Sequence, residues 1–216
     1  MSVRTVGMLC GAMGLLSACD AAGVDTPTQD ELTTTGFAQP SATGVINIGL
    51  EDNITSRVAQ TSAGSGIGYA FQTGAIPQEG LFAVAGLLPG TAASMTPRPS
   101  GTASYSGTYN LVEVENIDLG GGFITGDPTL RSGNVTLISN FASGSIIDSG
   151  TSALSVNGTV NGANLGGTVT YNGVQGNLDG LIGGNRAIGA FHGEGNVGPG
   201  SEDDYMYAGG FITTRN

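Results

Sequence analysis

The sequence predicts an all-β fold: a single eight-stranded antiparallel up-and-down β-barrel, preceded by a small mixed segment rich in Gly and Ala. From residue 102 onward, runs of β-branched and aromatic residues recur between breaks of Gly, Asn and Ser, at the spacing of antiparallel strands. Asn-Gly pairs at 157–158, 161–162 and 172–173 are typical of tight hairpins. Glycine makes up 39 of 216 residues without a collagen-like period, so the glycines serve turns, bulges and close contacts between strands.

Each expected strand of the barrel begins and ends at such a break. The ranges are 102–114, 135–141, 145–148, 152–157, 165–171, 174–182, 187–192 and 205–214. Sequential strands joined by tight hairpins favour closure, because closure removes the two unpaired edges of an open sheet. Glycines inside the strands provide bends and bulges, as at Gly107, Gly166, Gly176 and Gly189. A transmembrane barrel is disfavoured, since the sequence lacks a sustained outward apolar band and paired aromatic girdles.

Residues 43–97 form the small segment that precedes the barrel. Ranges 45–50 and 66–71 are expected as strands, and 79–88 as either a strand or a short helix, because runs of Ala, Leu and Gly do not separate the two by period. Pro97, Pro99 and Gly101 then mark a boundary. We therefore expect the barrel domain to occupy residues 98–216.

Residues 1–18 predict a signal peptide. One cation, Arg4, precedes an apolar stretch over 5–16 that is too short to span a bilayer as a helix. It ends in Leu16-Ser17-Ala18-Cys19, which resembles the lipobox of bacterial lipoproteins. This resemblance implies cleavage before Cys19, a diacylglycerol group on its thiol and a further acyl chain, such as palmitate, on its amino group. An ordinary secretory signal is the alternative. Residues 19–42, rich in Thr, Gln, Pro and Asp, are expected as a flexible tether.

Charge and cysteine content narrow the range of partners. The net charge is −11, and no Lys is present. Because binding to phosphate groups needs clustered cations, which the sequence lacks, a nucleic-acid partner is excluded. Attraction to anionic lipid headgroups is equally disfavoured, and membrane contact is expected through the lipid anchor alone. With Cys10 cleaved off and Cys19 acylated, no cysteine is left for a disulfide.

Residues 98–214 resemble the barrel domain of transferrin-binding protein B and its relatives, which include the factor H binding proteins. The resemblance is in the stretches 101–109, 140–144, 189–193 and 208–211. It implies a water-soluble, lipid-anchored barrel with a binding role. In the loop 193–204 the sequence departs from the family pattern, and the chain is too short for the two-lobed receptor. Binding of transferrin therefore does not follow. The expected core aromatics are Tyr105, Tyr109, Phe141, Phe191 and Phe211.

No catalytic, cofactor-binding or metal-binding residue is expected. His192 is the only histidine, and a solvent-facing position on a strand is the favoured interpretation. The acidic residues Glu194, Glu202, Asp203 and Asp204 match no calcium motif and are expected as a solvated loop. A Ser-His-Asp arrangement would depend entirely on His192.

The predicted function is that of an envelope lipoprotein acting as a non-catalytic binding module for an extracellular protein, an iron-bearing solute or another solute. The alternative is a structural envelope lipoprotein without a dedicated ligand, and a third hypothesis is a hydrolase that uses His192. We expect attachment to the outer membrane with exposure at the cell surface. Asp20, directly after the anchor cysteine, leaves retention in the inner membrane open.

Overall fold

The computed structural model describes residues 33–48, 56–64, 66–76, 80–96, 100–118, 125–195 and 205–216. The predicted signal peptide, Cys19 and Asp20 lie outside these ranges, as do Pro97, Pro99 and the acidic stretch 202–204. Within the described residues, no helix is long and apolar enough to cross a membrane.

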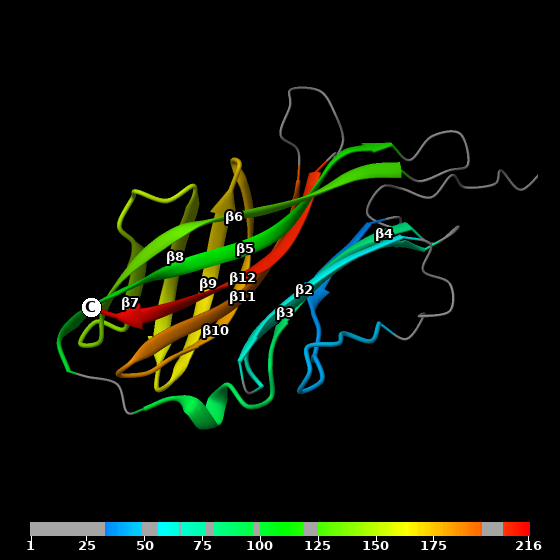
Figure 1. The fold of residues 1–216 in the computed structure, drawn as a ribbon. Helices are drawn as coiled ribbons and strands as arrows, with labels where there is room; N and C mark the ends of the chain where they lie inside the picture. The colour runs from blue at the N-terminus through cyan, green and yellow to red at the C-terminus, as the bar shows by residue number, and fades with distance from the viewer. Residues whose placement is uncertain are drawn as a thin grey trace, which may run out of the picture.

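Eight strands close into a barrel, which confirms the fold predicted from the sequence (Figure 1). Each strand is antiparallel to the next along the chain, and β12 pairs with β5 to close the ring. The last two strands pair through ten residues each. The barrel strands are β5 (Thr102–Asp118), β6 (Thr125–Asn140), β7 (Ser145–Asp148), β8 (Leu154–Asn161), β9 (Asn164–Tyr171), β10 (Val174–Ile182), β11 (Arg186–Gly195) and β12 (Tyr205–Arg215).

The barrel interior is a packed core. Along β8, buried and exposed residues alternate without exception, as expected of a strand with one face inward. Inward rings lie over glycines on the neighbouring strand: Gly189 pairs with Phe211, and Gly133 pairs with Tyr109. A Cβ added to Gly189 would lie 2.5 Å from the Phe211 ring, so the ring occupies the space that a side chain would need.

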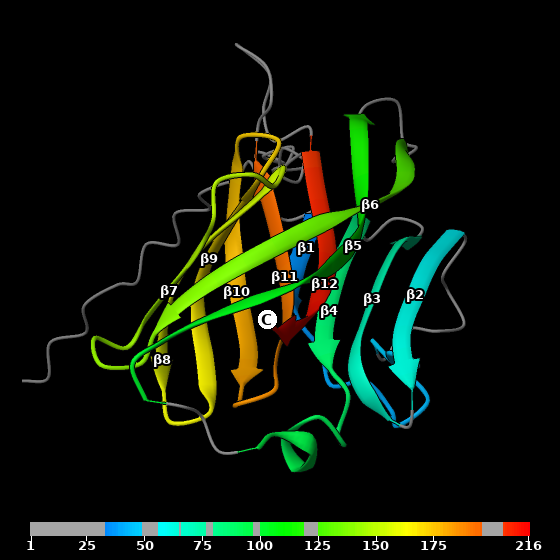
Figure 2. The same ribbon diagram turned by 60° about the vertical axis from the view of Figure 1, so that its left-hand side comes forward.

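A second, four-stranded sheet packs against the outside of the barrel (Figure 2). Its strands are β1 (Thr33–Phe37), β2 (Ser56–Gly64), β3 (Ile67–Ile76) and β4 (Gly80–Leu87), in the order β1-β4-β3-β2. The β1–β4 pair is parallel and the others are antiparallel. One face, with Tyr69, Phe71 and Leu81, buries apolar surface against β5, β11 and β12. A 3₁₀ turn, η2 (Ala92–Ser94), lies between β4 and the barrel.

The structure corrects several details. Residues 33–37 of the predicted tether instead form β1 on the edge of the small sheet, because this Thr-rich segment has a strong strand preference. Residues 45–48 are not a strand: Ile46 is buried against the outer face of that sheet. The ambiguous range 79–88 contains the strand β4. The Asn-Gly pair at 157–158 lies inside β8 rather than in a turn.

Candidate binding site between the small sheet and the barrel

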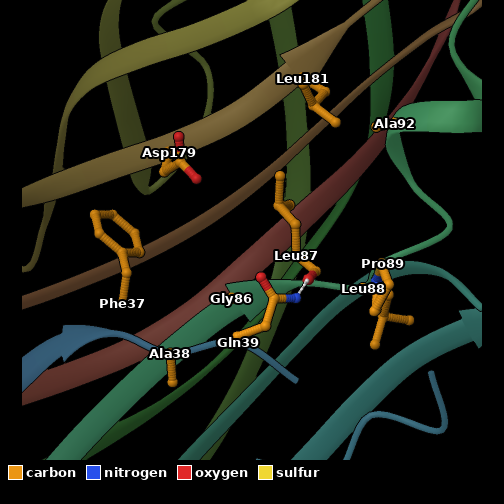
Figure 3. A pocket seen from close by; sticks show the side chains of 10 residues that line it. All are labelled: Phe37, Ala38, Gln39, Gly86, Leu87, Leu88, Pro89, Ala92, Asp179 and Leu181. Atoms are coloured by element: carbon orange, nitrogen blue, oxygen red, sulfur yellow. Dashed lines mark hydrogen bonds between the residues drawn. The ribbon is translucent and has the colours of Figure 1, made fainter. Parts of the chain in front are cut away.

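A groove of about 440 Å³ lies between the end of the small sheet and the outer wall of the barrel. Figure 3 shows Asp179 and Leu181 on the barrel side, opposite residues that follow β1. The lining residues are Phe37, Ala38, Gln39, Gly86, Leu87, Leu88, Pro89, Ala92, Asp179 and Leu181. The groove therefore combines apolar side chains, the Gln39 amide and one carboxylate.

A close backbone crossing shapes this groove. The amide N–H of Ala38 donates to the Ala85 carbonyl over 2.9 Å, which extends the β1–β4 pairing by one residue. A Cβ added to Gly86 would lie 1.8 Å from the Ala38 carbonyl oxygen, so only glycine allows the chain to pass here. The Gln39 Nε2 donates to the Leu87 carbonyl over 3.4 Å, which holds the side chain along the groove (Figure 3).

The strand β1 has one open edge. The backbone N–H and C=O groups of successive residues point alternately to the two sides of a strand. The Ala38 N–H points to β4, so the N–H and C=O groups of Thr35 and Phe37 point away from β4. No backbone hydrogen bond within the described residues reaches this outer edge. An open edge is a template for pairing with another strand.

Phe37 lies where this edge meets the groove, and it contacts His192. The ring is 46% exposed, and its edge meets the imidazole with ring centroids 4.6 Å apart. His192 is only 7% exposed, so the expectation of a solvent-facing histidine is wrong: β1 covers it. Its Nδ1 has no hydrogen-bond partner among the described residues, and burial lowers the pKa of the imidazole below its usual 6.5.

Two carboxylates lie near this edge. The Thr35 hydroxyl donates to Glu194 Oε1 over 3.3 Å, which ties β1 to the outer face of β11. Asp179 is exposed on β10, and its side-chain carboxylate has neither a hydrogen bond nor an ion pair within the described residues. A negatively charged surface on a chain of net charge −11 favours a cationic ligand over an anionic one.

A second polar cluster lies inside the barrel, toward the end that holds the β9–β10 turn. Glu113 is 3% exposed and accepts hydrogen bonds from the Arg131 Nε and, over 2.7 Å, from the Tyr205 hydroxyl. A buried carboxylate is tolerated because both partners donate to it. The sequence analysis missed Glu113. Its position two residues after Leu111 and four after Tyr109 places it on the same, inward face, and this parity is the signal that identifies it.

Tyrosine rings surround this ion pair. Tyr171 packs against Tyr109 and Tyr207 with centroid distances of 6.2 and 6.0 Å, and Tyr207 packs against Tyr205. The Tyr207 hydroxyl donates to the Val174 carbonyl over 3.1 Å. Burial raises the pKa of the Tyr205 and Tyr207 hydroxyls far above their usual 10, so both are neutral donors. The cluster closes this end of the barrel with satisfied polar groups.

The aromatics predicted as barrel core all lie in one interior cluster. Their side chains are at most 8% exposed, and the Tyr105 hydroxyl donates to the Gly183 carbonyl over 2.7 Å. The five residues are Tyr105, Tyr109, Phe141, Phe191 and Phe211. They lie apart from the groove, which is lined by outward-facing side chains. Among the described side chains, no group of three or more His, Cys, Asp or Glu is close enough to hold a metal ion.

Comparisons with known proteins return matches among solved structures. No protein-family model matches the chain, and no curated protein sequence does. Two structures of HpuA from Kingella denitrificans, one in complex with human haemoglobin and one apo, are 16% and 17% identical with a TM-score of 0.37. Intact Ap-TbpB, with its N and C lobes, is 13% identical with a TM-score of 0.43.

These alignments cover 74% of this chain in each case. They span 61% and 62% of the two HpuA chains and 35% of Ap-TbpB, so this chain corresponds to part of each. Transferrin-binding protein B, the family that residues 98–214 resemble in sequence, is thus among the matched structures. The likeness concerns the fold alone.

Proposed function

We propose that this chain is a bacterial envelope lipoprotein whose small sheet and barrel form a non-catalytic binding module for a protein ligand. The observation that carries the proposal is the Phe37 ring, 46% exposed beside the groove and the open edge of β1. Aromatic side chains of this kind are enriched where proteins bind one another.

The packing of the barrel favours an external site. Interior side chains from all eight strands form one buried cluster, and the polar Glu113 inside it is already paired. A ligand is therefore expected on the outer surface. The groove is the place where backbone, apolar surface and an unpaired carboxylate meet.

The lipobox-like residues Leu16 to Cys19 support an anchored location. A module held at a membrane by acyl chains meets ligands that approach it from the aqueous side. The outer membrane is the proposed site.

A library of random twelve-residue peptides displayed on phage tests the proposal. Selection on the wild-type chain is expected to enrich peptides whose affinity falls at least about tenfold for Phe37→Ala, since an aromatic anchor that binding buries contributes about 2 kcal/mol or more. Ile147→Ala is the matched control, because Ile147 is 51% exposed on β7 and takes no part in the groove. If no enriched peptide distinguishes the two variants, the proposal is wrong and a structural role without a ligand is the better account.

A further inference from the structure

We infer that the ligand binds as an extended strand added to the open edge of β1, and that it places a Lys or Arg two residues from a large apolar residue. This inference rests on the proposed function and specifies its ligand. It depends on the geometry of β1, β10 and the groove.

The backbone geometry provides the first step. The N–H and C=O groups of Thr35 and Phe37 point to the free side of β1, and no described backbone group pairs with them. A peptide strand on that side would continue the small sheet from four strands to five. Backbone pairing of this type provides affinity, and the pockets for alternate side chains provide specificity.

The position of β1 over the barrel provides the second step. Thr35 bonds Glu194 and Phe37 contacts His192, so β1 runs along the outer face of β11. The neighbouring barrel strand on that side is β10, where Asn177 pairs with His192 and Asp179 pairs with Ala190. A strand added beside β1 therefore lies over the outward side chains of β10.

The period of a strand then sets the sequence pattern. Barrel-facing side chains of the added strand recur every second residue, at about 6.6 Å. In the added strand, the barrel-facing side chain level with Phe37 faces Asn177, and the side chain two residues further on faces Asp179. The side chain two residues beyond that reaches Leu181 and Leu87 at the groove. The unpaired carboxylate selects a cation, and the apolar side chains select a large apolar residue two positions away.

The experiment compares variants of β1 and β10 with synthetic copies of the peptides that the phage selection enriches. Thr35→Pro removes the outward N–H and is expected to bind at least about tenfold more weakly than Thr35→Ala, which loses the same hydroxyl bond to Glu194 but keeps the N–H. Asp179→Asn is expected to cost about fivefold, and raising salt is expected to remove that difference. Circular dichroism checks that each variant is folded.

The outcomes separate the two proposals. Enriched peptides that carry the cation and apolar pair and respond to Thr35→Pro and Asp179→Asn support the inference. Peptides that depend on Phe37 but bind Thr35→Pro and Thr35→Ala equally, or lack the cation, overturn the inference and leave the binding function standing. Peptides that are insensitive to Phe37 overturn both.

Discussion

The Phe37 ring meets His192 edge-on, with ring centroids 4.6 Å apart and planes at 81°. Phe37 lies at the end of β1 and His192 on the outer face of β11, so this contact joins the small sheet to the barrel. Together with the Thr35–Glu194 hydrogen bond it positions the edge of β1 beside β10. The same contact buries the only histidine of the chain.

Mild acid is expected to destabilise the protein through His192. Burial holds the folded-state pKa below 6.5, so the unfolded chain takes up the proton first as the pH falls. The free energy of unfolding is then unaffected by this group above about pH 6.5 and decreases below it, by at most about 1.4 kcal/mol per pH unit. Urea unfolding between pH 5 and pH 7 measures this slope. His192→Gln, which does not titrate, is expected to show a smaller slope; an equal slope contradicts the assignment.

Loss of one partner of the Glu113–Arg131 pair is expected to cost more than loss of both. Arg131→Met leaves a carboxylate that is 3% exposed with only the Tyr205 hydroxyl, and is expected to lower the free energy of unfolding by more than the double variant does. The Arg131 side chain is 48% exposed, so solvent screening reduces the cost of losing it. The double variant Glu113→Gln with Arg131→Met removes the unpaired charge. Chemical denaturation of the two single variants and the double variant measures the coupling, and additive effects would contradict it.

Gly189 and Phe211 are expected to be coupled through volume. Gly189→Ala places a methyl group 2.5 Å from Phe211 Cζ and 2.8 Å from Leu178 Cδ1, and is expected to destabilise the barrel by about 1–3 kcal/mol. Phe211→Leu frees space beside that methyl group, so the double variant is expected to be more stable than the sum of the single changes by at least about 0.5 kcal/mol. Thermal or chemical unfolding of the wild type, the two single variants and the double variant measures this coupling free energy. A double variant that is merely additive shows that the ring does not fill this space.

Gly86→Val is expected to deform the groove. Its Cβ would lie 1.8 Å from the Ala38 carbonyl oxygen and 2.9 Å from Pro40 Cδ, so residues 38–40 must move. We expect a loss of peptide affinity of at least about tenfold together with destabilisation of about 1–3 kcal/mol. Gly36→Ala is the matched control, since its Cβ meets no atom within 4 Å. Equal peptide affinity of the two variants would show that the groove is not part of the binding site.

The barrel was predictable because its signals are local. The Asn-Gly pair at 172–173 forms the β9–β10 turn with φ of 51° at Asn172 and 84° at Gly173, as a primed turn requires. The bounds of β7 match the predicted 145–148. At 157–158 the same dipeptide has another role: a Cβ on Gly158 would lie 2.7 Å from the Gly166 carbonyl, so the glycine serves a close strand approach inside β8.

The candidate site was not predictable because it depends on contacts between distant segments. β1 pairs with β4, which begins more than forty residues later in the chain, and nothing local in 33–37 identifies that partner. The burial of His192 follows from the same long-range contact. Glu113 was missed although it shares the face of Tyr105 and Tyr109, because a carboxylate is seldom buried without a partner and Arg131 lies on β6 before the predicted strand 135–141.

Anchoring through Cys19 has a separate test. Cys19→Ser in the native host is expected to move the protein from the membrane fraction to the soluble fraction, because two or three acyl chains are needed for stable attachment. Mass spectrometry of the wild-type protein checks for the acylated amino terminus. A free thiol on mature protein, or an uncleaved leader, contradicts the lipoprotein assignment.

Amide hydrogen exchange at Thr35 and Phe37 tests the binding account most directly. At a saturating concentration of a selected peptide, both amides are expected to exchange at least about tenfold more slowly, because a new strand accepts their hydrogen bonds, while the amide of Ile147 is unchanged. Saturation without any slowing at Thr35 and Phe37 would contradict the claim that the free edge of β1 is where this protein receives its ligand.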